Sequence, residues 1–235
     1  MSDNAKFGSH INRIVNEANG IKNRILRTFN SRDELSMLTL YKSLILPKLE
    51  YCCQLWNPAS IGDIEDIEAV QRSFTAKIET VKDKNYWDRL KTLGLYSLQR
   101  RRERYCIIYV WKILEGLVPN DIGLKLSKNI TRGRTIYIEG TTCNTQSVKT
   151  LRNDSFSRNS PRIFNSLPSN LKDISSCTVD TFKKSLDAFL KNIDDTPPIA
   201  SYENTWPHYN QLTNLLKFNR MRDGRQTVVA PTTAV

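Results

Sequence analysis

The chain has 235 residues, enough for one sizeable domain or two small ones, and its 39% hydrophobic content excludes a wholly disordered protein. Its 35 Lys and Arg residues outnumber its 24 Asp and Glu residues, which gives a net charge of +11. Residues 123–162 hold eight basic residues and two acidic ones, so this stretch carries +6 of that charge. Such clustering favours binding of a polyanion over a basic protein without a binding role.

The first hundred residues repeat apolar side chains at helical spacing. The pattern predicts helices over residues 7–26, 31–46, 47–56, 63–78 and 86–95. Ser31 is the expected N-cap of the second helix, with Glu34 completing a capping box, and Pro47 is expected to end or kink it. The acidic first turns of the fourth helix suit the positive end of its dipole better than a metal site. These acids are Asp63, Glu65, Asp66 and Glu68.

Residues 97–115 predict the most distinctive helix, capped by Ser97 and ended at Gly116. Its front half carries four arginines around a single Glu103, and its rear half from Tyr105 to Leu114 is apolar on every side. A helix that is apolar all round is buried, so we expect the rear half to enter the core and the cationic front end to stay at the surface. The alternative for the arginines is a solvated face without a ligand.

The character of the sequence changes after Pro119. Residues 119–159 predict a basic irregular segment with one short strand at 135–138. A short helix is expected to start at Pro161, and an amphipathic helix is expected to be capped by Thr178. Residues 195–235 predict a linker, a last short helix over 211–221 and a disordered tail from Gln226. The expected fold is mainly α: a helical bundle over 1–118, the basic segment 119–159 and a smaller helical region over 160–194.

The remaining composition points to an intracellular protein, nuclear or cytoplasmic, that is not secreted. The five cysteines show no short CxxC spacing, so we expect reduced thiols, with Cys52 and Cys106 buried in helices. The two histidines offer little material for a zinc site. No apolar run is long enough to span a bilayer, and no cleavable leader is recognised. We therefore expect no cofactor, no metal and no membrane partner.

No motif for catalysis is present in the sequence. A polymerase needs carboxylates that hold two metal ions at the reacting phosphate. The only adjacent aspartates are Asp194 and Asp195, which follow a helical pattern and have no flanking strand. We therefore expect that the chain is not an enzyme.

An ordered set of sequence phrases is more specific than any single motif. In chain order they are ILRTF (25–29), LYKSLILPKLEYC (40–52), LWNP (55–58), IEAVQRSF (67–74), YWDRLKTLGL (86–95), LQRRR (98–102), WKILEG (111–116), NSLP (165–168) and FK (182–183). Together they resemble the region after the catalytic palm in jockey-like LINE (non-LTR) retrotransposon reverse transcriptases, over roughly residues 6–192. The palm aspartate pair and the endonuclease of that family are absent from this sequence.

The resemblance implies a helical thumb-like module that contacts the phosphate backbone of a template–primer duplex without reading its bases. The expected partners are RNA, DNA or an RNA–DNA hybrid, together with a separate palm-and-fingers chain. The residues expected to contact nucleic acid are Lys22, Arg24, Arg27, Arg100, Arg101, Arg102 and Arg104, followed by Arg132 and Arg134.

Other interpretations stay open. The chain is alternatively a helical protein–protein interaction protein, or an inert retroelement relic, whose basic groups only keep it in solution. A third hypothesis is a reverse transcriptase that a separate catalytic chain completes. An orphaned apolar patch around the N-terminal helices and Trp56 would invite self-association.

Overall fold

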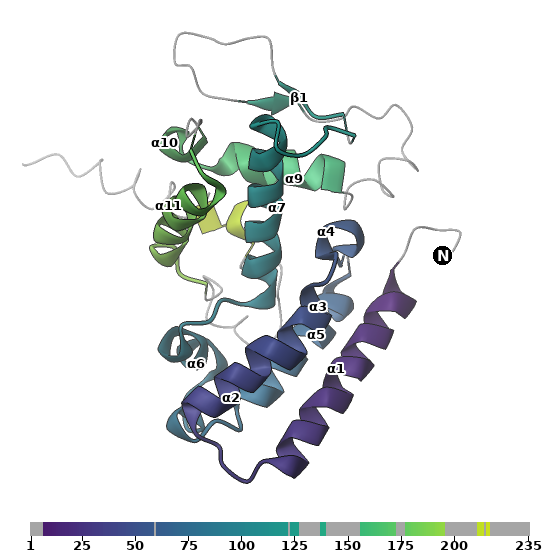
Figure 1. Ribbon diagram of the computed structural model, residues 1–235, viewed down its shortest axis with the longest axis vertical. Helices are drawn as coiled ribbons and strands as arrows, with labels where there is room; N and C mark the ends of the chain where they lie inside the picture. Colours follow the sequence, from purple (N-terminus) through teal and green to yellow (C-terminus); the bar gives the residue numbers. More distant parts are fainter. Residues whose placement is uncertain are drawn as a thin grey trace, which may run out of the picture.

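The computed structural model describes residues 7–58, 60–121, 123–126, 137–139, 156–172, 177–195, 211–213 and 215–216. The protein is mainly helical, as predicted (Figure 1). The predicted sites Arg132 and Arg134, and the tail from Gln226, lie outside the described residues. The helices of the first part are α1 (Gly8–Thr28), α2 (Glu34–Leu40), the π-helix η1 (Tyr41–Ile45), α3 (Leu46–Glu50), α4 (Cys53–Trp56), α5 (Ile61–Thr75), the 3-10 helix η2 (Glu79–Val81) and α6 (Tyr86–Leu93).

Helix α7 (Leu98–Leu114) links this part to the second one. The second part contains the strands β1 (Lys125–Leu126) and β2 (Ile138–Glu139), which pair antiparallel, and the helices α9 (Phe156–Ser166), α10 (Ser169–Lys172) and α11 (Val179–Lys191). Helix α9 contains Pro161 in its interior, so the prediction that this proline starts the helix is wrong. The predicted cap of α11 is confirmed, because the Thr178 hydroxyl accepts from Thr181 N–H at 3.2 Å.

Helix α1 is amphipathic and packs its apolar side on α3 and α5 (Figure 1). Ile11, Ile14 and Ile25 are buried, and the opposite side of the helix faces solvent. Arg32 caps the C-terminal end of α1, where its Nη2 donates to Leu26 O at 2.7 Å. A cation at this end complements the negative end of the helix dipole.

The start of α2 differs from the predicted capping box. Asp33, not Ser31, is the N-cap: its carboxylate accepts from Ser36 N–H at 2.9 Å, and the Ser31 hydroxyl donates to that carboxylate at 2.5 Å. A carboxylate suits the positive end of a helix better than a hydroxyl does, which explains the choice.

The chain stays helical through Pro47, although this proline was expected to end or kink the second predicted helix. A π-helix over Tyr41–Ile45 precedes it, and Leu46 N–H bonds back to Tyr41 O, five residues earlier. Proline has no amide N–H to donate, and its ring clashes with the carbonyl four residues back in a regular α-helix. The wider turn before Pro47 relieves that clash. The helix breaks later, at Cys52, which is exposed and has a left-handed φ of 52°. The buried thiols are therefore Cys53 and Cys106 instead of Cys52 and Cys106.

Two apolar cores divide the buried residues, and α7 contributes to both. Leu98 packs in the first core with α1 to α6, and Tyr105 packs against it. Residues from Ile107 onward belong to the second core, where Trp111 stacks on Phe182 with ring centroids 4.5 Å apart. The predicted burial of the rear half of α7 is confirmed. The change of core therefore falls inside α7.

Candidate nucleic-acid interface

The four arginines of α7 do not form the solvent-facing cationic end that the sequence predicts. Arg100 is 0% exposed and Arg102 is 2% exposed, so this expectation is wrong for both. Arg100 donates to the carbonyls of Ile193 and Asp194 and lies 3.7 Å from the Asp195 carboxylate. Arg102 donates to Gln99 Oε1 at 2.9 Å. Neither guanidinium is available to a phosphate in this structure.

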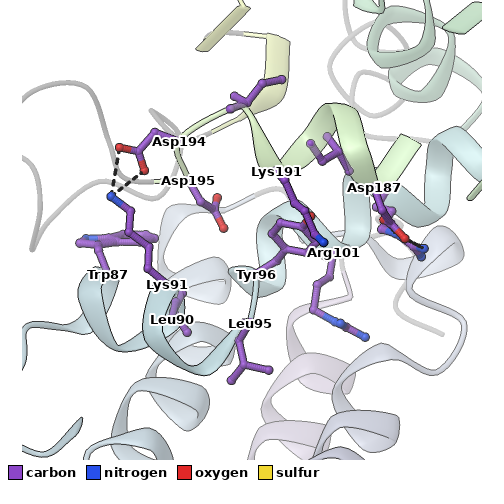
Figure 2. Close-up of a pocket in the computed structure, with 14 residues that line it drawn as sticks. Trp87, Leu90, Lys91, Leu95, Tyr96, Arg101, Asp187, Lys191, Asp194 and Asp195 are labelled. Atoms are coloured by element: carbon purple, nitrogen blue, oxygen red, sulfur yellow. Dashed lines mark hydrogen bonds and ion pairs between the residues drawn. The ribbon is translucent and has the colours of Figure 1, made fainter. Parts of the chain in front are cut away.

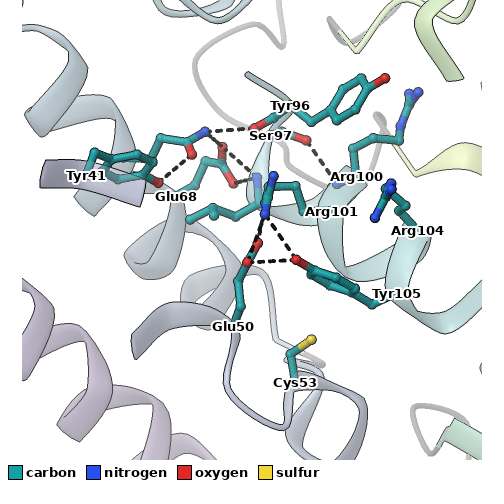
Figure 3. A network of polar contacts seen from close by, with 12 residues as sticks. Tyr41, Glu50, Cys53, Glu68, Tyr96, Ser97, Arg100, Arg101, Arg104 and Tyr105 are labelled. Carbon is teal, nitrogen blue, oxygen red and sulfur yellow. Dashed lines mark hydrogen bonds and ion pairs between the residues drawn. The ribbon is translucent and has the colours of Figure 1, made fainter. Parts of the chain in front are cut away.

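Arg101 and Arg104 are partly exposed, but each is bound by a carboxylate, and Figure 3 shows the Arg101–Glu50 pair. Arg101 makes a two-point contact with Glu50, in which Nη2 lies 3.0 Å from Oε2. Arg104 makes the same kind of contact with Asp187, at 2.5 and 2.8 Å. The bond to Asp187 raises the pKa of Arg104. Two-point arginine–carboxylate pairs are strong and directional, so both arginines act first as internal ties.

Glu68 is a buried structural carboxylate, although the sequence placed it among the acids that complement the dipole of its helix. It is 4% exposed, and it accepts from Leu98 N–H at 3.0 Å at the start of α7 and from the Tyr86 hydroxyl. Burial raises the pKa of Glu68 to about 7. The available signal was its position, since Glu68 and Gln71 continue the apolar stripe of Ile64 and Ile67 on α5.

Gln71 connects Glu68 to the surrounding aromatic side chains. Its amide oxygen accepts from the Tyr41 hydroxyl at 2.6 Å, and its Nε2 donates to the Tyr86 hydroxyl at 2.9 Å and to Tyr96 O at 3.1 Å. These bonds satisfy polar groups that burial would otherwise leave unpaired. We call Glu68, Gln71, Arg100, Arg102, Glu103 and Asp195 the buried polar layer.

The adjacent aspartates belong to this layer and its rim. Asp195 accepts from Ser97 N–H at 2.6 Å and from the Ser97 hydroxyl at 2.9 Å, whereas Asp194 pairs with Lys91 at 3.2 Å. Both therefore bind groups of the chain itself. Within the residues that the structure describes, no cluster of three or more His, Cys, Asp or Glu side chains is arranged to hold a metal ion.

Glu103 ties α7 to the C-terminal part of the chain. Its two oxygens accept from Leu212 N–H at 3.1 and 3.0 Å, and it lies 4.0 Å from Arg100 Nε. Burial raises the pKa of Glu103 to about 7. Cations near a helix N-terminus oppose its dipole, and the carboxylates of Glu68 and Asp195 offset that cost at the start of α7.

The predicted cations of α1 are placed differently. Arg24 and Arg27 are exposed, and the described part of the chain offers neither of them a carboxylate within ion-pair distance. Lys22 is half-buried and donates to the Ser73 hydroxyl at 2.8 Å. Partial burial, together with nearby Lys77, lowers the pKa of Lys22.

Arg13 joins these residues, although it was not predicted as a site. Arg13, Arg24 and Arg27 are 11 and 3 positions apart, which at about 3.6 residues per turn places them on one side of α1. All three are exposed. Glu17 lies on the same side and pairs with Lys48 of α3 at 3.7 Å. We call Arg13, Arg24 and Arg27 the α1 basic row.

A cleft of about 600 Å³ lies between α6 and α11, beside the front half of α7 (Figure 2). Trp87 and Tyr96 contribute aromatic rings, and Lys91, Lys191 and Asp187 are among its charged lining residues.

No family model, curated protein or solved structure was found to match this chain. Among the described residues, no helix has the length and apolar character needed to cross a membrane. The assignment of a function therefore depends on the site itself.

Proposed function

We propose that this chain is a non-catalytic module that binds the phosphate backbone of a nucleic-acid duplex without sequence specificity, in the manner of a reverse-transcriptase thumb. The observation that carries the proposal is the α1 basic row. Its cations are exposed, whereas Arg100 and Arg102 of α7 are buried and Arg101 and Arg104 are bound by internal carboxylates. The ordered phrases similar to LINE reverse transcriptases support the same function.

The geometry of the row suits a duplex. Arg13 and Arg27 are 14 residues apart, which corresponds to about 21 Å along the helix at about 1.5 Å per residue. This length equals about six base pairs at about 3.4 Å each. A straight row of cations without a pocket for a base contacts phosphates and carries no sequence information.

The test is fluorescence anisotropy with a labelled RNA–DNA hybrid over a series of salt concentrations. The variant Arg24→Gln/Arg27→Gln removes two phosphate contacts, so we expect weaker binding and a log–log salt slope smaller by about 2. Substitutions in Arg100–Arg104 are unsuitable, because they remove bonds that hold the fold.

A matched control removes the same charge elsewhere. Lys125→Gln/Lys184→Gln neutralises two exposed lysines outside the first core. Equal losses for the two double variants would indicate general charge attraction and contradict a defined interface on α1. No binding of the native chain at low salt would reject the proposal altogether.

The second candidate is a helical protein–protein interaction protein, and the exposed apolar side chains near α2 to α4 favour it. Leu35 and Tyr51 are 79% exposed and Leu55 is 74% exposed, whereas Trp56, which was expected in such a patch, is buried. A chain that binds no hybrid but sediments as a concentration-dependent oligomer would support this candidate. A reverse transcriptase completed by a separate catalytic chain predicts polymerisation only after mixing with that chain.

A further inference from the structure

The cleft between α6 and α11 is separate from the α1 basic row and has the size of a small-molecule site. Its volume of about 600 Å³ lies inside the range of about 300–1,000 Å³ that such sites occupy. Leu90, Leu95 and Ile193 give it apolar walls, and Trp87 and Tyr96 add aromatic ones (Figure 2).

Most charges around the cleft are already neutralised. Arg104 holds Asp187, Lys91 holds Asp194, and Asp195 is bound by Ser97 and lies beside Arg100. These acids therefore do not repel an anion as free carboxylates would, and these cations are not free to bind one.

Two polar groups of the lining stay uncommitted within the described part of the chain. Lys191 is exposed and makes no ion pair there. The Tyr96 hydroxyl is buried and lacks a hydrogen-bond partner. Burial raises the pKa of Tyr96, so its hydroxyl remains a donor at neutral pH. Lys191 and Tyr96 both line the cleft, and Figure 2 labels them there.

We propose that this cleft binds a small aromatic anion. Its ring packs against Trp87, Tyr96 and the apolar walls, and its anionic group accepts from the Lys191 ammonium and the Tyr96 hydroxyl. A buried hydroxyl without a partner is rare in folded proteins, and an anionic acceptor would satisfy it while pairing the free cation. The anionic group is a carboxylate or a phosphate, which offer the same acceptor chemistry.

The experiment titrates the full chain with phenyl phosphate, benzoate and neutral benzyl alcohol. Binding is followed by NMR through the indole N–H signal of Trp87, which Trp87→Phe identifies. We expect saturable shifts with at least one anion, and binding of benzyl alcohol about tenfold weaker, since a hydrogen bond to a charged group is stronger than one to a neutral group. A response to one anion alone identifies the carboxylate or the phosphate as the natural group.

Two variants test the assigned contacts. Lys191→Gln and Tyr96→Phe should each reduce the preference for the anion over benzyl alcohol, and a dispersed NMR spectrum confirms that each variant is folded. Lys184→Gln is the matched control, because Lys184 is an exposed lysine of the same helix outside the lining. Equal binding of the three probes, absence of any saturable shift, or equal losses in Lys191→Gln and Lys184→Gln would overturn the proposal.

Discussion

The two halves of α7 are buried by different means. The front half places Arg100 and Arg102 inside the protein. Arg100 donates to the carbonyls of Ile193 and Asp194 and lies beside the Asp195 carboxylate, whereas Arg102 donates to Gln99 of the same helix. The rear half places Ile107 and Trp111 among apolar side chains of α9 and α11. Burial of the rear half follows from its composition, whereas burial of the front half depends on partners elsewhere in the chain. A run of arginines is therefore no reliable sign of a surface when a fold supplies matching acids.

The largest effect is expected in the rear half. Trp111→Ala should lower the free energy of unfolding by about 3–5 kcal/mol, because it removes a fully buried ring that stacks on Phe182. Urea denaturation measures the change. Leu117→Ala, at a side chain that is 56% exposed, should stay within about 0.5 kcal/mol. Similar losses in both variants would remove the contrast between buried and exposed sites.

The stability of the buried polar layer around the front half of α7 should depend on pH. The pKa values of Glu68 and Glu103 are raised to about 7 from 4.5, so the folded chain holds these protons more tightly than the unfolded chain. Protonated Glu68 and Glu103 therefore add to the free energy of unfolding. This contribution is full below about pH 4.5 and is lost as pH rises through about 7, and it amounts to on the order of 3 kcal/mol for each group.

Urea denaturation at several pH values measures this loss. The control is Glu68→Gln/Glu103→Gln, whose stability should change less over the same range because neither amide titrates. A native chain that is equally stable from pH 4.5 to 8 would contradict the assignment.

A smaller effect is expected from removing one acceptor of the buried polar layer. Glu68→Ala, measured at pH 6, should cost about 2 kcal/mol, because it leaves Leu98 N–H and the Tyr86 hydroxyl without that partner. Glu68→Gln keeps an acceptor and should cost less. Asp66→Ala removes an exposed acid from the same helix and serves as the control. If it lowered the free energy of unfolding as much as Glu68→Ala does, the bonds of Glu68 in the buried polar layer would not account for the loss.

The smallest effect is expected outside both halves. Arg24→Gln/Arg27→Gln should change stability by no more than about 0.5 kcal/mol, because both side chains are exposed and unpaired in the described structure. The same variant is expected to weaken nucleic-acid binding, so its thermal unfolding separates a binding defect from a folding defect. A lower unfolding temperature would place these arginines among the structural residues.

Local signals in the sequence predicted most helix positions and several of their ends. The end of α6 at Gly94, with its φ of 61°, and the cap of α7 at Ser97 follow from short-range rules. The π-helix before Pro47 could not be predicted in this way. A proline shows that a regular α-helix is unfavourable there, but it does not show which altered geometry the chain adopts.

The site was less predictable because its bonds join distant residues. In the sequence Arg100 looks like a surface arginine, and only the fold shows that it lies beside Asp195. Glu68 likewise looks like an acid that complements a helix dipole, and only the fold shows that it accepts from Leu98 N–H. Charge and spacing identify the ionisable groups of such a layer, but not which of them meet. Arg24 and Arg27 were simpler, since the apolar stripe of α1 already defines its outer side.

The long reach of the buried polar layer also sets an order of events during synthesis. Asp195 lies 98 residues after Ser97, and Leu212 lies 109 residues after Glu103. At about 5–20 residues per second, the front half of α7 leaves the ribosome roughly 5–20 s before these partners leave it. Until then Glu68 is the acid of the layer from an earlier helix that is already present to meet α7. Nascent chains that stop before Asp187 therefore present Arg100 and Arg104 without the carboxylates of Asp195 and Asp187, whereas Glu50 is already available to Arg101.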